Sequence, residues 1–364
     1  MFGGRFRYFS FEEPLVRQRA QEDPEDLLDA AGEPLIIDEV QYVPEITTYL
    51  KMRIDVQRAK RGRFILTGSQ QFHLIKNLGD SLSGRIALFT LLPFNIRETA
   101  AIPDRREKGA RAVFIAACLR GSFPEISIHK KINVNSWYNG YLQTYLERDI
   151  RNIHAVDNLR DFQKFMQLLA ARCAQVLNLS ALSQDLGVTV NTLKRWISLL
   201  EATQIIYLLP PYYNNLGKRI TKNPKVYFLD CGLVAFLVGI RDAAHLLQGP
   251  MAGAIFENYI IQETVKAYFN HGLRPRIYYL RTQNELEVDL IIEKSLQLFP
   301  CEIKLSQSPN TAMAQPLERF RRVFGKLDIG PAKIVCLSDK ATFLTRSVSV
   351  LPLADFPDWL KDKL

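Results

Sequence analysis

The chain has 364 residues, of which 47% are hydrophobic and 23% charged, proportions typical of globular proteins rather than of disordered or fibrous chains. Its length suggests two or three domains, and its formal net charge of +9 favours polyanionic partners such as DNA. The longest apolar runs are much shorter than the roughly 18 to 20 residues that span a bilayer, and the N-terminus lacks the apolar core of a secretory signal. We therefore expect a cytoplasmic protein without a membrane span.

The region up to about residue 100 alternates short apolar runs with helical stretches. The runs Pro34 to Ile37, Phe64 to Thr67 and Ile86 to Leu92 surround a helical pattern over Ile46 to Ala59. This rhythm predicts an α/β fold with a buried parallel sheet. The polar segment Ala100 to Arg111 then predicts an exposed connection and a domain boundary near residue 100.

Asp38 and Glu39 directly follow the expected strand that ends at Ile37. Open α/β sheets bind ligands at the carboxyl ends of their strands, so these two acids stand where a nucleotide would bind. An apolar strand followed by Asp-Glu is the Walker B pattern, in which the Asp helps to hold Mg²⁺ and the Glu orients or activates water. Two acids that only solubilise a strand end are the alternative interpretation.

A second expected strand ends in small hydroxyl residues, Thr67 and Ser69, where ATPases of this kind place a sensor of the γ-phosphate. Arg85 follows in a Ser-Gly-Arg turn. Its guanidinium is suited to a phosphate in its own subunit or in a neighbour's, so a homo-oligomer is one possibility. A simple surface arginine is the other interpretation of Arg85.

The motifs IIDEVQYVPEI, FILTGSQQF and SLSGRIALFTLLPFNIRE together resemble a prokaryotic family of AAA-type P-loop ATPases that carries a C-terminal domain of unknown function. The resemblance covers nearly the whole chain and implies ATP and Mg²⁺ as cofactors. The family's Gly-rich Walker A loop, which ends in Gly-Lys-Ser/Thr, has no counterpart in this sequence. Because that loop holds the β- and γ-phosphates, we expect impaired nucleotide binding. We expect an N-terminal truncation, since RYFSFEEPLVRQRAQEDPEDLL matches the family's segment between the loop and the acidic strand.

The middle of the chain, residues 112–240, shows mostly helical spacing. LSALSQDLGVTVNTLKRWISLLEATQIIYLLPP predicts a helix, a turn, a second helix and a strand, as in winged helix-turn-helix units. The apolar residues of the second helix share one face, which leaves these side chains outward to contact DNA: Asn191, Lys194, Arg195 and Ser198. A basic hairpin that follows is a candidate wing, with Lys218, Arg219, Lys222 and Lys225. A connector or a protein-docking module is the alternative. In VYFLDCGL, Asp230 is expected to cap the helix Gly232 to Val238.

The last region, residues 250–364, begins with a helical pattern over Ala254 to Phe269 and continues with strands. Asp289 lies on one strand of a predicted hairpin, and Glu302 and Lys304 share a face of the next strand. The arrangement resembles the core of the PD-(D/E)xK nuclease superfamily. The resemblance implies that Asp289 and Glu302 ligate Mg²⁺, that Lys304 orients or activates water, and that Glu257 is the helical acid many such nucleases add. A half-exposed strand with a cross-strand salt bridge is the alternative.

Three domains are therefore expected: residues 1–100, an incomplete P-loop NTPase-like α/β domain without Walker A; residues 112–240, helical and winged-helix-like; and residues 250–364, a nuclease-like α/β domain. Three functions follow from them. The chain is an ATP-linked, DNA-associated protein of the AAA type, a Mg²⁺-dependent nuclease, or a DNA-binding module without catalysis. The scattered cysteines and histidines predict free buried thiols and no zinc site.

Overall fold

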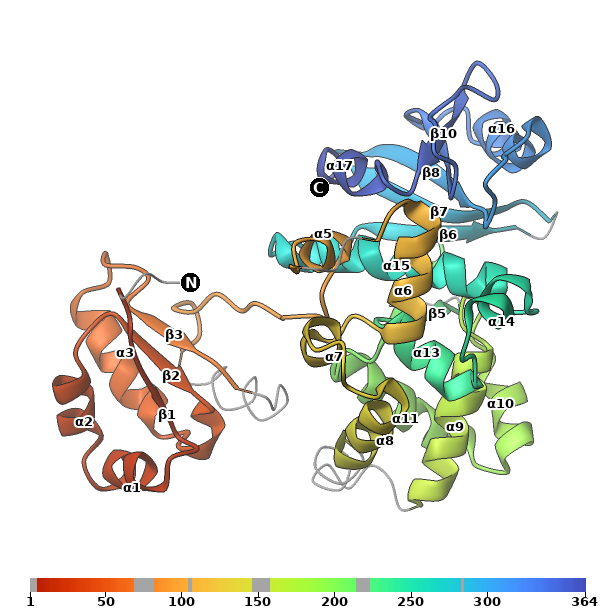
Figure 1. Ribbon diagram of the computed structural model, residues 1–364. Helices are drawn as coiled ribbons and strands as arrows, with labels where there is room; N and C mark the ends of the chain where they lie inside the picture. Colours follow the sequence, from red (N-terminus) through yellow and green to blue (C-terminus); the bar gives the residue numbers. More distant parts are fainter. Residues whose placement is uncertain (1–4, 69–81, 104–106, 146–157, 214–222, 283–284) are drawn as a thin grey trace. The chain divides into compact units, whose positions relative to one another are not determined.

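The computed structural model describes residues 5–68, 82–103, 107–145, 158–213, 223–282 and 285–364. The chain divides into two compact units, Met1–Leu88 and Phe89–Leu364, here called unit 1 and unit 2 (Figure 1). Each unit is described by itself.

Unit 1 alternates strands and helices, as its sequence predicts. Its elements are β1 (Arg7–Ser10), α1 (Pro14–Glu22), α2 (Pro24–Ala31), β2 (Leu35–Asp38), the 3₁₀ turn η1 (Val40–Tyr42), α3 (Ile46–Val56) and β3 (Phe64–Leu66). Pro14 and Pro24 occupy the first turns of α1 and α2, where a missing N–H costs nothing. Asp23 caps α2 by accepting a hydrogen bond from the amide of Asp26.

In the described part of unit 1, three strands form a parallel sheet in the order β1-β2-β3. Leu35 and Ile37 of the middle strand are buried against the helices, whereas the alternate residues Ile36 and Asp38 are half-buried. The strand ends are in register, with Ser10 opposite Asp38. The predicted parallel sheet is confirmed, and Asp38 lies at its carboxyl edge.

The apolar run Ile86 to Leu92, which the sequence placed in this sheet, forms neither helix nor strand. Leu88, Phe89 and Leu91 are largely exposed, whereas Leu92 is partly buried against the core of unit 2. The prediction of a third apolar strand here was wrong, because apolar composition alone does not supply a neighbouring strand to pair with.

Unit 2 is larger and holds both the helical middle and the C-terminal strands. Its helices are α5 (Ile96–Ala100), α6 (Ala110–Arg120), α7 (Pro124–Ile128), α8 (Val134–Tyr145), α9 (Leu159–Ala171), α10 (Leu179–Leu186), α11 (Val190–Ala202), α13 (Cys231–Val238), α14 (Ala243–Gln248), α15 (Ala252–Asn270), η3 (Thr311–Ala314), α16 (Gln315–Val323) and α17 (Phe356–Lys361). Its strands are β4 (Ile206–Leu209), β5 (Lys225–Phe228), β6 (Ile277–Arg281), β7 (Glu287–Lys294), β8 (Gln297–Ile303), β9 (Ala332–Cys336) and β10 (Val348–Pro352).

The larger sheet of unit 2 has the order β10-β9-β8-β7-β6 (Figure 1). Strands β6, β7 and β8 are antiparallel neighbours, whereas β8, β9 and β10 run parallel. The long helix α15 contacts α13 and β5 as well as β8 and α17. One hydrophobic core therefore runs from the helical middle into the C-terminal sheet, and the two regions form a single compact unit.

In the helical middle, the predicted order of helix, turn, helix and strand is present. Asn178 caps α10, and Gly187 ends it in the left-handed conformation. Thr189 then caps α11, and the antiparallel pair β4–β5 follows. These local signals explain why the sequence divides into two short helices at this point.

Asp230 is a buried junction of unit 2. It caps α13 by accepting from the amide of Leu233 at 2.9 Å, as predicted. It also accepts from the amide of Ser122 at 2.8 Å, from the Ser122 hydroxyl at 2.6 Å, and from the hydroxyl of Tyr138. Gly121 and Gly232 leave room for this junction, since a Cβ at either position would overlap the Tyr138 hydroxyl.

The first segment of unit 2, residues 89–100, here called the connecting segment, is bound to the rest of unit 2 at its second half. The amide of Ile96 donates to Glu263 at 2.6 Å, and Lys266 donates to the carbonyl of Phe94 at 3.0 Å. The division between units therefore falls at Leu88, earlier than the boundary expected near residue 100. No helix in the described part of the chain is long and apolar enough to cross a membrane. All five cysteines are buried free thiols, as predicted.

Candidate functional sites

The carboxyl edge of the unit 1 sheet brings Asp38 and Thr67 together. The Thr67 hydroxyl donates to Asp38 Oδ1, and the Tyr8 hydroxyl donates to Asp38 Oδ2 at 3.0 Å. The hydrogen bond from Thr67, aided by that from Tyr8, holds the pKa of Asp38 below its usual range, although partial burial opposes this shift. Asp38 is therefore an anion at neutral pH, as a Mg²⁺ ligand must be.

Glu39 follows Asp38 in a left-handed backbone conformation, with φ of 53°. This conformation is uncommon for a residue with a side chain and is often found at functional sites. The turn is held by the amide of Val40, which donates to the Thr67 carbonyl at 3.0 Å. The side-chain amide of Gln41 donates to Glu39 Oε2. Two neighbouring strands thus support the acid pair.

Arg85 is not brought beside Asp38. Its guanidinium makes two hydrogen bonds to the carboxylate of Asp55, at 2.7 and 3.0 Å. Asp55 lies in the last turn of α3, which returns the chain to the start of β3, so this pair lies toward the opposite end of the sheet. The role of Arg85 at a phosphate stays a prediction. Ser69 lies outside the described residues.

The three residues predicted for the nuclease-like site converge in unit 2. Asp289 is on β7, Glu302 is on β8, and Lys304 directly follows β8. Lys304 Nζ is 2.7 Å from Glu302 Oε2 and 3.3 Å from Asp289 Oδ2. The amide of Ile303 also donates to Asp289 at 2.9 Å. The side chains of both acids are buried, whereas that of Lys304 is 37% exposed.

Glu302 is a buried acid of this cluster whose ionised form is disfavoured. Burial and the charge of Asp289 raise the pKa of Glu302 to about 8, although Lys304 opposes the shift. Its Oε1 atom is buried and has no hydrogen-bond partner. An unsatisfied buried oxygen is costly, and carboxylate oxygens are the ligands that Mg²⁺ prefers. The donor set of Asp289 and Glu302 therefore fits a divalent cation.

Glu257 lies on α15 and has different partners. Its Oε1 atom accepts from Lys225 Nζ at 3.0 Å and from the Tyr227 hydroxyl at 2.6 Å. Burial and the charge of Asp289 raise the pKa of Glu257 to about 7, against the effect of Lys225 and Tyr227. Within the described residues, no three His, Cys, Asp or Glu side chains are grouped closely enough to hold a metal ion. Glu257 is therefore not assembled with Asp289 and Glu302 as a third ligand.

Lys225 is buried, so the prediction that it lies on an exposed basic hairpin was wrong. Lys225 is only 3% exposed, because every residue of β5 is buried and the strand contacts α15. Lys225 Nζ also lies 2.8 Å from Glu287 Oε1. The period of two in Lys225-Val-Tyr227 was the available signal, since it places the lysine and the tyrosine on one face of a strand. The other basic residues of the hairpin, Lys218, Arg219 and Lys222, lie outside the described residues.

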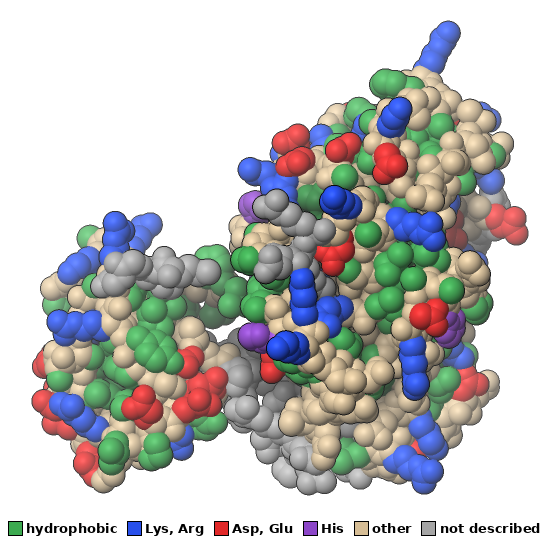
Figure 2. All heavy atoms as spheres, in the orientation of Figure 1, with side chains coloured by type: hydrophobic (Ala, Val, Ile, Leu, Met, Phe, Trp, Pro, Cys, Tyr) green, Lys and Arg blue, Asp and Glu red, His purple; other side chains and the backbone are tan. Residues whose placement is uncertain are grey.

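The outward face of α11 is the one that the sequence predicts. Leu193, Trp196 and Ile197 are buried. The exposed residues are Asn191, Lys194, Arg195 and Ser198. Over the face seen in Figure 2, Lys and Arg side chains are scattered across unit 2 rather than gathered in one patch. Unit 1 has 12 Lys and Arg against 13 Asp and Glu, and unit 2 has 35 against 25, so the basic excess belongs to unit 2.

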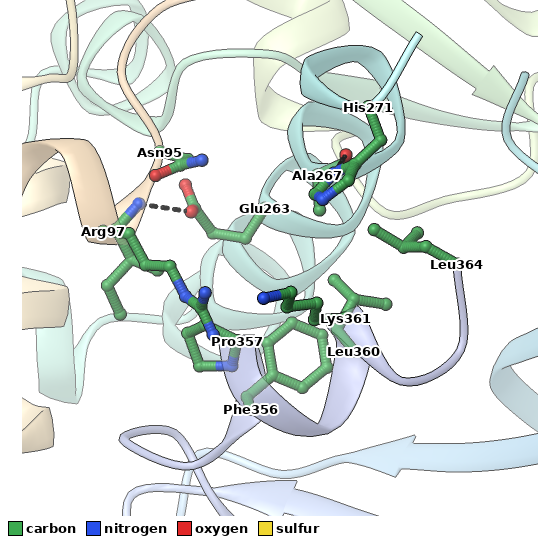
Figure 3. Close-up of a pocket in the computed structure, with 11 residues that line it drawn as sticks. Asn95, Arg97, Glu263, Ala267, His271, Phe356, Pro357, Leu360, Lys361 and Leu364 are labelled. Atoms are coloured by element: carbon green, nitrogen blue, oxygen red, sulfur yellow. Dashed lines mark hydrogen bonds between the residues drawn. The ribbon is translucent and has the colours of Figure 1, made fainter. Parts of the chain in front are cut away.

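A small pocket lies between the second half of the connecting segment, α15 and α17 (Figure 3). The carboxylate of Glu263 reaches the amide of Ile96 on one side, and Phe356 and Leu360 provide an apolar side. Arg97 pairs with Asp358 of α17. The pocket therefore marks where the connecting segment is seated on unit 2.

Comparison with known proteins agrees with the geometry of unit 1. An AAA domain model matches residues 3–100, and two models of domains of unknown function, DUF8612 and DUF4143, match residues 111–244 and 252–356. The AAA and DUF4143 matches support an AAA-type ATPase-like family.

Curated relatives resemble most of the chain. The uncharacterized proteins Rv2008c of Mycobacterium tuberculosis and Mb2031c of Mycobacterium bovis are each 29% identical over 304 residues. These alignments cover 83% of this chain but only 65% of each relative, so the chain spans about two thirds of their length. The uncharacterized protein MJ1544 of Methanocaldococcus jannaschii is 22% identical, over 93% of this chain and 77% of that protein.

Among solved structures, protein VC1899 from Vibrio cholerae is 13% identical and covers 96% of this chain and 79% of its own. Its TM-score of 0.24 is too low to indicate a shared fold.

Proposed function

We propose that unit 1 carries the magnesium-binding and water-orienting side of an ATP site in an AAA-type ATPase. The observation that carries this proposal is the ionised carboxylate of Asp38 at the carboxyl edge of β2, held by Thr67 from the neighbouring strand. Asp38 would hold the Mg²⁺ that accompanies the phosphates, Glu39 would orient the attacking water, and Thr67 would report the γ-phosphate. The bound Mg²⁺ supplies neutralisation of phosphate charge.

The sequence has no Gly-Lys-Ser/Thr loop to hold the phosphates, so we propose that this chain alone binds ATP weakly. Asp38 and Glu39 provide no positive charge or row of amides for the β- and γ-phosphates. Calorimetric titration with Mg²⁺-ATP is expected to give a Kd of about 1 mM or weaker, lost in Asp38→Asn. Asp29→Asn, at a side chain that is 73% exposed, is the matched control. Micromolar binding that persists in Asp38→Asn would overturn the proposal.

We further infer that unit 2 carries a Mg²⁺-dependent site for cleaving phosphodiester bonds, of the PD-(D/E)xK type. The unpartnered, buried Oε1 atom of Glu302 favours this second function, because it leaves a ligand oxygen for a cation. Asp289 and Glu302 would hold the ion. Lys304, which contacts both acids, would orient the water and balance the negative charge of the transition state. Bound Mg²⁺ supplies Lewis-acid polarisation of the phosphate.

Cleavage is tested with plasmid and linear DNA in the presence of Mg²⁺. We expect cleavage that EDTA stops and that Asp289→Ala abolishes. Asp242→Ala, at an exposed helix cap away from the cluster, should cleave like the wild type. DNA binding without any Mg²⁺-dependent cleavage would instead favour the third function, a binding module without catalysis.

DNA is the proposed substrate because unit 2 carries the basic excess and because α10, α11 and the β4–β5 pair follow in the order of a winged helix-turn-helix. The exposed Lys194 and Arg195 of α11 would contact phosphates. Fluorescence anisotropy at several salt concentrations is expected to show weaker binding by the Lys194→Ala/Arg195→Ala variant, with a salt slope reduced by about 2. Lys164→Ala, at an exposed lysine of α9, is the control. An unchanged slope would exclude α11 from the interface.

A further inference from the structure

Lys225 is a buried cation contributed by the helical middle to the acids of the C-terminal sheet. It begins β5, and only 4% of its side chain is exposed. Lys225 Nζ lies 3.0 Å from Glu257 Oε1 and 2.8 Å from Glu287 Oε1, and 5.5 Å from the ring centre of Tyr279. A buried lysine is stable only with such charge partners.

The acids around Lys225 and Lys304 form two adjoining pairs. Asp289 and Glu302 contact Lys304, whereas Glu257 and Glu287 contact Lys225. The pairs adjoin because Glu287 and Asp289 lie two residues apart on β7 and share one face of that strand, and the charge of Asp289 acts on both Glu257 and Lys225. The Tyr227 hydroxyl, on the same face of β5 as Lys225, further fixes Glu257. Hydrogen bonds from Lys225 and Tyr227 thus hold the Glu257 carboxylate against β5.

The charges of this cluster leave room for one divalent cation. Four carboxylates face two ammonium groups, so that two negative charges remain when all the acids are ionised. One Mg²⁺ compensates them. The unpartnered Oε1 atom of Glu302 marks the pair that would receive it, while Glu257 Oε1 already accepts from Lys225 and from Tyr227.

We propose that Lys225 is the internal counter-ion of Glu257 and limits the acid cluster to a single divalent cation, held by Asp289 and Glu302. Glu257 is then a positioning residue and not a metal ligand, in contrast to the role that the nuclease resemblance implies for it. The helical middle thereby completes the site of the C-terminal sheet. This inference rests on the proposed cation site in unit 2.

Calorimetric titration of the full chain with Mn²⁺ separates these roles. Glu257→Gln and Glu302→Gln remove the same charge, so that any difference between them reflects ligation. We expect one Mn²⁺ per wild-type chain, a loss of affinity of about 100-fold in Glu302→Gln, and a change of less than about tenfold in Glu257→Gln. Equal losses in the two variants would overturn the inference.

Lys225→Met provides the second test. Without the ammonium, the cluster carries a third uncompensated negative charge, so this variant should bind a second Mn²⁺ or bind the first at least about tenfold more tightly. The double variant Lys225→Met/Glu257→Gln restores the charge balance and should return to wild-type binding. Circular dichroism checks that both variants fold. If Lys225→Met does not fold, the Glu257→Gln comparison decides alone. A folded Lys225→Met variant with wild-type binding would contradict the inference.

The titrations also distinguish failure of this inference from failure of the proposed cleavage site. If neither the wild type nor Lys225→Met binds Mn²⁺, the proposed cation site itself is wrong. If the wild type binds one Mn²⁺ but loses it in Glu257→Gln as in Glu302→Gln, only the role assigned to Lys225 and Glu257 is wrong.

Discussion

The two units shift the pKa values of their acidic residues in opposite directions. In unit 1, Asp38 lies at a sheet edge and is stabilised as an anion by the hydroxyls of Thr67 and Tyr8, which lower its pKa. In unit 2, Glu302 is buried, and desolvation together with Asp289 raises its pKa to about 8. Neutral hydroxyl donors are therefore enough to favour the ionised form of Asp38 at the sheet edge. In the buried cluster, the ionised form of Glu302 needs cations beside it.

The two units also differ in their balance of charged residues, which bears on the partners proposed for each. Unit 1 is nearly neutral, with 12 basic against 13 acidic residues, whereas unit 2 has 35 against 25. A nearly neutral surface has no general attraction for DNA, while a basic one does. The difference favours unit 2 for the proposed DNA contact, while the site proposed in unit 1 is for a small, magnesium-bound nucleotide.

The largest expected effect tests whether the units are independent. Asp230→Ala leaves the amides of Ser122 and Leu233 and the hydroxyl of Tyr138 without their buried acceptor, which should cost unit 2 about 3 to 5 kcal/mol. Calorimetry should show that only the transition of unit 2 moves. The exposed helix cap Asp242→Ala should cost about 1 kcal/mol. Equal shifts of both transitions would show that the units unfold together.

The next effect concerns the pH dependence of unit 2. Glu302 has its pKa raised from 4.5 to about 8, so the unfolded chain loses this proton at lower pH than the folded one. The free energy of unfolding should therefore fall as pH rises from about 4.5 to about 8, by an amount on the order of a few kcal/mol. Glu302→Gln should remove this slope in urea unfolding measured across that range. An identical slope in the variant would contradict the burial cost assigned to Glu302.

A smaller effect is expected at the turn between β7 and β8, which holds the strands of the acid cluster in register. Ser295 and Leu296 both have positive φ, of 49° and 71°, and Leu296 is 78% exposed. Such two-residue turns favour glycine. Leu296→Gly should raise the stability of unit 2 by about 1 kcal/mol, measured by thermal unfolding. Leu296→Ala keeps a side chain at the same φ and should not.

The smallest effect is expected at the edge of unit 1. Asp38→Asn should change the stability of unit 1 by less than about 1 kcal/mol near pH 7, because the edge is partly hydrated and its hydrogen bonds join Asp38 to hydroxyl groups. Because the pKa of Asp38 is lowered below 3.8, its small contribution is present above that pH and lost as pH falls below it. Thermal unfolding between pH 3 and 7 measures this. A large loss at neutral pH would show that Asp38 is structural.

Local patterns predicted the features that depend on short stretches of sequence. Strand β2 with its terminal acid, the buried face of α11, and the cap at Asp230 each follow from spacing within a few residues. The convergence of Asp289, Glu302 and Lys304 could also be predicted, because two antiparallel strands joined by a tight turn must lie side by side.

The features that sequence reasoning missed depend on residues far apart in the chain. The pairing of Arg85 with Asp55 requires knowledge of where α3 ends in space. The burial of Lys225 depends on its partners Glu257 and Glu287, the nearer of which comes 32 residues later. The basic residues near Lys225 in the sequence suggested a basic surface. Its acidic partners, Glu257 and Glu287, could be identified only from the packing of β5 in the structure.

Helix α15 makes two separate sets of polar contacts within a short length, one to the connecting segment and one to β5. Glu263 and Lys266 fasten the connecting segment through Ile96 and Phe94, and Glu257 is paired with Lys225. Six residues separate Glu257 from Glu263, which is about 9 Å along a helix. One helix therefore holds both the connecting segment and Glu257, which lies beside the acid cluster.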